Sequence, residues 1–166
     1  MDQNKRVFLV GFMGSGKTTI GKLLAKKLKI PFFDIDTEIE LREGLTIPQI
    51  FSLKGEPYFR QLEFEVLKNI VSQNEEFVIA TGGGLGANPE AMDYMKKQGV
   101  VIWLDLDFEK FKKRTSKDIN RPLLKLNEKE LFALFQKRKE IYKKAHFHIE
   151  SQRSPEETVK KILEVL

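Results

Sequence analysis

The sequence contains no cysteine, and no hydrophobic run in it approaches the length of a membrane span. The absence of cysteine excludes disulfides, thiolate metal sites and cysteine nucleophiles, and it is consistent with a reducing compartment. The apolar run near the N-terminus, Val7–Val10, is far too short for a signal sequence or a membrane segment. We therefore expect a cytoplasmic protein with no membrane partner.

Histidine is also scarce, and the two histidines, His146 and His148, stand two residues apart in an alternating apolar and polar stretch. No third ligand lies nearby in the sequence, so we interpret the pair as one face of a strand rather than as a metal site. Repeats, low-complexity tracts and linkers are absent. With 166 residues, 41% hydrophobic and 32% charged, the chain predicts a single globular domain over residues 1–166.

The most informative motif is G-x-x-x-x-G-K-T, which begins at Gly11 and closes at Thr18. A strand-like run precedes it and apolar residues at helical spacing follow it, which is the context a P-loop requires. The glycines let the backbone approach a phosphate closely, and the following helix N-terminus presents N–H groups to it. Lys17 suits the β- and γ-phosphates and the Thr18 hydroxyl suits Mg²⁺. A glycine-rich turn that binds nothing fits this context poorly. The predicted phosphate-binding residues are Gly14, Ser15, Gly16, Lys17, Thr18 and Thr19.

Four further apolar runs alternate with helical patterns, which predicts a parallel three-layer α/β domain. After the first of these, Phe32-Phe33, come Asp34 and Asp36. Two residues apart at a strand end, they should point to the same side, where parallel sheets bind ligands. They suit Mg²⁺ and a substrate hydroxyl, or one of them caps the next helix. Both interpretations can hold for different members of the pair.

Two later segments leave alternatives open. Arg60 stands near the start of a long helix, either as a binding residue or as a surface arginine paired with Glu63 or Glu56. Four glycines follow the strand Phe77–Ala80 within the range 82–86. They indicate either a backbone that approaches a ligand closely or a wide turn with positive φ.

The net charge of +5 is concentrated in residues 109–144, which contain thirteen Lys or Arg against five Asp or Glu. Such a stretch attracts polyanions, so contact with nucleic acid must be considered. No aromatic stacking platform accompanies it, and we favour a solvated helix face plus a few arginines directed at ATP. Within it, residues 115–126 lose apolar periodicity and form a candidate lid, or an ordinary long loop.

Taken together, these motifs resemble the shikimate kinase family, within the nucleoside-monophosphate-kinase-like fold. The resemblance runs nearly the whole chain and implies a five-stranded parallel sheet in the order 2-3-1-4-5. It also implies transfer of the γ-phosphoryl group of ATP to shikimate, giving shikimate 3-phosphate in the pathway to chorismate and aromatic amino acids. It rests on Gly11–Thr19, Asp34–Asp36, Gly55–Arg60, Thr81–Gly84, Arg121–Leu124 and Arg138 with Tyr142.

The resemblance assigns roles to individual residues, with residues 34–62 as the substrate-binding region. Arg60 and Arg138 hold the shikimate carboxylate, and Asp36 orients or deprotonates the 3-hydroxyl. Asp34, with Thr18, supports Mg²⁺, either directly or through water. The remaining assignments are Gly82, Gly83 and Gly84 for substrate and γ-phosphate, Arg121 of the lid for the phosphates, and Arg114 and Arg153 for the adenine. One departure is Thr18-Thr19, where a Ser-Thr pair is common; either hydroxyl can bind Mg²⁺.

Two other functions remain open at this stage. One is a kinase of the same fold acting on gluconate or a nucleotide, because gluconate also has a carboxylate for arginines. The other is a nucleotide-dependent protein that contacts nucleic acid through the basic stretch, which predicts steep salt dependence of binding. The leading interpretation has shikimate and ATP as small-molecule partners and no nucleic acid. Without a sustained heptad or an extra apolar face, we expect a monomer.

Overall fold

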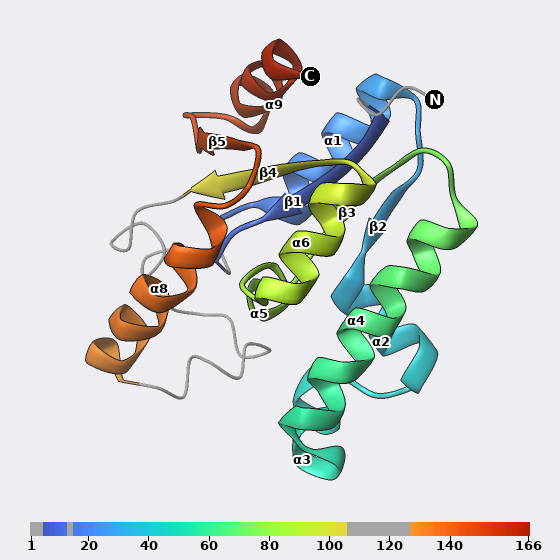
Figure 1. Ribbon diagram of the computed structural model, residues 1–166, viewed down its shortest axis with the longest axis vertical. Coiled ribbons are helices and arrows are strands. Elements are labelled where there is room, and N and C mark those ends of the chain that lie inside the picture. Colours follow the sequence, from blue (N-terminus) through green and yellow to red (C-terminus); the bar gives the residue numbers. More distant parts are fainter. Residues whose placement is uncertain (1–4, 13–14, 106–126) are drawn as a thin grey trace.

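The computed structural model describes residues 5–12, 15–105 and 127–166, which form an α/β fold around a five-stranded parallel sheet (Figure 1). The strand order is β2-β3-β1-β4-β5, so the expected order 2-3-1-4-5 is confirmed. Every neighbouring pair of strands is parallel. The strands are β1 (Arg6–Val10), β2 (Phe32–Asp34), β3 (Phe77–Ala80), β4 (Val100–Asp105) and β5 (Phe147–Glu150).

Helices connect these strands and cover both faces of the sheet (Figure 1). Between β1 and β3 lie α1 (Lys17–Leu28), α2 (Ile35–Glu43), α3 (Ile47–Lys54) and α4 (Glu56–Gln73). The others are α5 (Gly83–Gly86), α6 (Pro89–Gln98), α8 (Glu128–Tyr142) and α9 (Pro155–Val165). Within the described residues, no helix is both long and apolar enough to cross a membrane.

The central strands are buried on both faces, and their side chains divide the core into two clusters. Phe8 and Val10 of β1 pack with α4, α6 and α8, whereas Val7 and Leu9 pack with α1 and α9. This alternation follows from the two-residue period of a strand, even though every residue of β1 is buried. The sheet is therefore the middle layer of three, and the carboxyl ends of its strands are brought together at one edge.

The second strand ends earlier than the sequence argument required. Asp34 is the last residue of β2 and also the N-cap of α2, where its carboxylate accepts a hydrogen bond from the Thr37 N–H. Asp36 therefore lies in the first turn of α2. The expectation that strand alternation points Asp34 and Asp36 to the same side is wrong in its premise, because the chain turns helical between them.

Candidate active site

Gly11, at the start of the P-loop, lies against the end of β4. Gly11 has a φ of 150°, and a Cβ at this position would overlap the carbonyl oxygen of Leu104. Gly16 has a φ of 89° and is the N-cap of α1, in the left-handed region that favours glycine. These two glycines are thus required by the backbone path. Gly16 leads directly into the N-terminus of α1.

Two polar side chains of this loop lie ready for an anion. The buried Lys17 ammonium donates to the carbonyl oxygens of Gly11, at 2.6 Å, and Phe12, at 3.1 Å. Ser15 Oγ is buried and has no hydrogen-bond partner among the described residues. A buried hydroxyl without a partner is costly, and a phosphate oxygen would satisfy it. The loop therefore has the chemistry of an anion site.

Thr18 and Asp34 connect the P-loop helix to the end of β2. Thr18 Oγ1 donates to Asp34 Oδ2 at 2.6 Å, while Asp34 Oδ1 accepts from the Thr37 N–H at 3.2 Å. Asp34 is therefore the helix cap that the sequence left open as one interpretation, and it also contacts the P-loop threonine. Its role toward Mg²⁺ stays a prediction. The adjacent Thr19 is exposed. Within the described residues, no three His, Cys, Asp or Glu side chains cluster as a metal site.

A second group of charged side chains lies where α4 meets the segment after β3. Arg60 Nη1 lies 2.8 Å from Glu63 Oε1, and Arg60 Nε lies 3.5 Å from Glu56 Oε1. The pairing with Glu63 and Glu56 that the sequence left as an alternative is therefore present. It is not a simple surface pair, since the Glu63 side chain is only 1% exposed.

Glu63 is a buried carboxyl whose pKa is strongly shifted. Burial raises the pKa of its carboxyl to about 7, and the negative charge of Asp36 adds to the effect while Arg60 and Arg138 oppose it. The sequence analysis named Glu63 only as a possible partner of Arg60. Its spacing could have indicated burial, because it lies four residues from both Phe59 and Leu67 on the apolar face of α4.

The glycine segment after β3 approaches these side chains closely. Gly83–Gly86 form the short helix α5, and residues 82–86 contain no glycine with positive φ. The wide-turn interpretation is thus wrong. The close approach seen here is to protein side chains, and close approach to a ligand stays a prediction. A Cβ at Gly82 would lie 3.1 Å from both Asp36 Oδ1 and Glu63 Oε2, and one at Gly84 would overlap the Arg60 guanidinium.

Arg138 enters the same site from α8. Its guanidinium lies 5.6 Å from the centre of the Phe12 ring, and burial lowers its pKa, with the charge of Arg60 acting in the same direction. Tyr142, one turn further on, donates its hydroxyl hydrogen to the Gly83 carbonyl at 2.6 Å, and burial raises its pKa. The structure therefore brings together Asp36, Arg60, Gly82–Gly84 and Arg138, as the sequence predicted.

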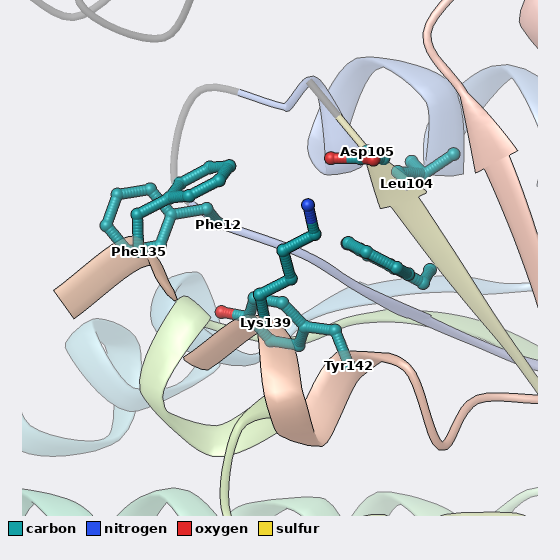
Figure 2. Close-up of a pocket in the computed structure, with 7 residues that line it drawn as sticks. Phe12, Leu104, Asp105, Phe135, Lys139 and Tyr142 are labelled. Atoms are coloured by element: carbon teal, nitrogen blue, oxygen red, sulfur yellow. The ribbon is translucent and has the colours of Figure 1, made fainter. Parts of the chain in front are cut away.

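A small pocket lies behind Tyr142, next to this site. Figure 2 shows Lys139 extending into it from α8, with Phe12 and Phe135 on one side and Asp105 at the end of β4. Its volume is about 10 Å³, which is room for roughly one water molecule. It is too small to receive a substrate, and its lining residues come from the P-loop, the end of β4 and α8.

Several predicted residues cannot be placed. Gly14, Arg114, Arg121 and the candidate lid at 115–126 lie outside the described residues. Arg153 is exposed in the segment after β5, and that segment contacts the P-loop because Ser151 Oγ donates to the Ser15 carbonyl at 3.3 Å.

The two histidines contact residues of the neighbouring strand β4. His146 precedes β5, and its Nδ1 accepts a hydrogen bond from the Val101 N–H at 3.0 Å. His148 lies within β5, stacks on Trp103 with ring centroids 4.0 Å apart, and has its Nε2 2.8 Å from Asp105 Oδ2.

The parallel sheet, the P-loop at its carboxyl edge and the facing cluster of arginines and carboxylates define a P-loop phosphotransferase. Comparison with known proteins identifies the family within this class. Residues 13–166 match the family model described as shikimate kinase. The chain belongs to the shikimate kinase family, whose members are ATP-dependent phosphotransferases.

Individual relatives agree with this assignment. The shikimate kinase of Aquifex aeolicus is 52% identical over 95% of this chain and 94% of its own, and its crystal structure superposes with a TM-score of 0.88. A shikimate kinase from Acinetobacter baumannii in complex with shikimate is 39% identical, with a TM-score of 0.90 over 96% of this chain and 90% of that one. A gluconokinase from Sinorhizobium meliloti, 12% identical over 99% and 92% of the two chains, has a TM-score of 0.55 and shares the fold alone.

Proposed function

We propose that this chain transfers the γ-phosphoryl group of ATP to the 3-hydroxyl of shikimate, giving shikimate 3-phosphate and ADP, on the way to chorismate and the aromatic amino acids. Membership of the shikimate kinase family supports this reaction. The structural observation that carries it is the convergence of two arginines, Arg60 and Arg138, with Asp36 around Gly82–Gly84.

The acceptor side of the site suits a hydroxylated carboxylate. Arg60 and Arg138 would hold the shikimate carboxylate, since planar guanidinium groups bind carboxylates through paired hydrogen bonds. Asp36 would accept hydrogen bonds from substrate hydroxyls and orient or deprotonate the 3-hydroxyl. Gly82, Gly83 and Gly84 leave room for the substrate and for the γ-phosphate. These roles use groups that the fold already places together.

The nucleotide side uses the P-loop. The ATP phosphates would be bound by Gly14, Ser15, Gly16, Lys17, Thr18 and Thr19. A phosphate oxygen would accept a hydrogen bond from Ser15 Oγ, which has no partner among the described residues. Lys17 would exchange its contacts with loop carbonyls for phosphate oxygens. Arg121, in a lid over residues 115–126, would close over the phosphates, and Arg114 and Arg153 would flank the adenine. Phosphoryl transfer needs mainly this positioning and charge neutralisation.

Magnesium is the implied metal, and the residues present fit it. Thr18 and Asp34 offer a hydroxyl and a carboxylate oxygen, which are the hard ligands that Mg²⁺ prefers. When bound, Mg²⁺ would neutralise charge on the β- and γ-phosphates. Asp34 would hold the threonine hydroxyl in place and support the ion, directly or through water. We further propose that the protein acts as a cytoplasmic monomer without a nucleic-acid partner.

The reaction is tested by measuring ADP release from ATP and Mg²⁺. Shikimate is compared with gluconate, with nucleoside monophosphates and with no acceptor. Release that depends on shikimate alone supports the proposal. Release with gluconate or a nucleotide would retain the fold and overturn the substrate. ATP binding without ADP release in the presence of any of these acceptors would favour the nucleotide-dependent binding protein.

A further inference from the structure

Among the described residues of the acceptor site, Glu63 is the buried carboxyl that the reaction leaves without a role. Its side chain is 1% exposed, and charged groups face it from three helices. Arg60 and the exposed Glu56 lie on its own helix α4, and Asp36 lies on α2. From α8 come Arg138 and the un-ionised phenol of Tyr142. The charges of Arg60, Asp36 and Arg138 act on the pKa of Glu63, and the Glu63 carboxylate in turn raises the pKa of Tyr142.

The charges of the free site nearly balance without a substrate. Arg60 and Arg138 provide two positive charges, and Asp36 and Glu63 provide two carboxyl groups. A docked carboxylate adds one negative charge to a region already partly desolvated. An unbalanced buried charge is costly, and proteins usually avoid it by changing the protonation of a nearby group. Asp36 is required as an acceptor for the substrate hydroxyls, which leaves Glu63.

We infer that Glu63 takes up one proton from solvent when the substrate carboxylate docks between Arg60 and Arg138. This rests on the proposed function, since it requires an anionic acceptor at the arginine pair. The balance is simple: a buffer acid gives up a proton, an O–H bond forms on Glu63, and the net charge of the site is unchanged by the incoming carboxylate. Glu63 would then be a positioning residue whose protonation is coupled to binding.

Two contacts set the direction of this coupling. Arg60 Nη1, which lies 2.8 Å from Glu63 Oε1, is drawn toward the substrate, so the carboxyl loses its main stabilising charge. The substrate brings a second carboxylate beside Asp36, which lies with Glu63 around Gly82. Both changes favour the neutral acid. Burial already holds the pKa of Glu63 at about 7, so a small change shifts its protonation at neutral pH. The neutral acid can donate a hydrogen bond, which the carboxylate cannot.

The coupling predicts a pH dependence of substrate affinity. At pH 7 the free protein would bind about half a proton at Glu63, and at pH 8 much less, so the uptake on binding would approach one proton. If the complex keeps its proton, shikimate affinity should fall about fivefold from pH 7 to pH 8. Below pH 6 the affinity should become nearly independent of pH, because Glu63 is already protonated there.

The experiment is isothermal titration of the full chain with shikimate at pH 6, 7 and 8, each in two buffers of different ionisation enthalpy. The dependence of the observed heat on buffer gives the number of protons taken up. We expect uptake that increases with pH in the unmodified protein and in Glu65→Gln, an exposed control on the same helix, and none in Glu63→Gln. Should Glu63→Gln not fold, the pH series of the unmodified protein tests the inference by itself.

The outcomes separate the two hypotheses. Shikimate binding without net uptake at pH 7 and 8, or with uptake unchanged in a folded Glu63→Gln protein, overturns the inference alone. A protein that binds ATP but shows no heat of shikimate binding at any pH overturns the proposed function, and the inference with it. Methyl shikimate, which lacks the carboxylate charge, provides a further check: if it binds with the same proton uptake, charge balance is not the cause.

Discussion

The Thr18 hydroxyl donates to the Asp34 carboxylate across 2.6 Å, and this contact joins the P-loop helix α1 to the junction of β2 and α2. Asp34 ends β2 and caps α2, and α2 contains Asp36. Asp34 therefore contacts Thr18, which would bind Mg²⁺. As N-cap, Asp34 also fixes the start of α2, the helix that contains Asp36, the proposed base. A change at Asp34 should therefore affect metal use before it affects folding.

The first prediction concerns Asp34→Asn. The amide still caps α2, because asparagine and aspartate are comparable N-cap residues, so stability should change little. Loss of the carboxylate should raise the Mg²⁺ concentration for half-maximal activity by roughly 10- to 100-fold, the usual effect of removing support from a metal ligand. A Mg²⁺ titration of the initial rate measures this, with the exposed Asp93→Asn as control. Equal Mg²⁺ requirements in the two variants would remove Asp34 from the metal site.

The second prediction concerns Arg138→Lys. A lysine keeps the positive charge but cannot reproduce the paired hydrogen bonds of a guanidinium. We expect the KM for shikimate to rise about 10- to 100-fold, corresponding to the loss of one hydrogen bond between charged groups, about 1.5–3 kcal/mol. The KM for ATP should stay near its original value. Steady-state kinetics test this beside Lys137→Arg, an exposed neighbour. Unchanged shikimate kinetics would take Arg138 out of the binding site.

The third prediction contrasts two glycines. A Cβ at Gly84 would overlap the Arg60 guanidinium, which is the flexible end of a side chain and can move away. Gly84→Ala should therefore fold normally while losing most shikimate affinity. Gly44 ends α2 with a φ of 67°, and a Cβ there would point into open space. Gly44→Ala should lose about 1 kcal/mol of stability through backbone strain and keep its activity. Thermal unfolding and kinetics of both variants compare the two effects, and a reversed pattern contradicts the assignment.

The fourth prediction concerns stability and pH in the ligand-free protein. The pKa of Glu63 is raised from 4.5 to about 7 in the folded state, so the folded protein holds a proton that the unfolded chain has released between these values. Stability relative to Glu63→Gln should therefore fall as pH rises through this window, by up to about 3 kcal/mol, and level off above it. Urea unfolding at pH 5, 6, 7 and 8 measures the difference. If the free energies of unfolding of the two proteins differ by the same amount at every pH, the pKa of Glu63 is not raised in the folded state.

The sequence predicted the features that depend on local chemistry or on the family resemblance. The P-loop needs glycine at fixed positions, so Gly11 and Gly16 reveal it directly. The strand order and the meeting of Arg60 with Arg138 followed from the resemblance, because residues far apart in the chain have no local signal for their contact. The resemblance also rested on Tyr142, and the structure shows its hydroxyl donating a hydrogen bond to the Gly83 carbonyl.

Two features were wrong or missed for physical reasons. The position of Asp36 was argued from strand alternation. However, Asp34 caps α2, so the helix begins at Ile35, one residue before Asp36. A three-residue strand is too short for its period to locate its end. Glu63 received no role of its own because a charged residue in a helix usually faces solvent, whereas here two arginines compensate part of the cost of its burial.

The most direct measurement is the identification of the product formed from ATP, Mg²⁺ and shikimate by ³¹P and ¹H nuclear magnetic resonance. The account predicts ADP together with a phosphate monoester whose phosphorus couples to the proton on C3 of shikimate. A phosphate on another hydroxyl would contradict the positioning by Asp36 and the arginine pair. Inorganic phosphate as the sole phosphorylated product besides ADP would contradict the transfer reaction itself.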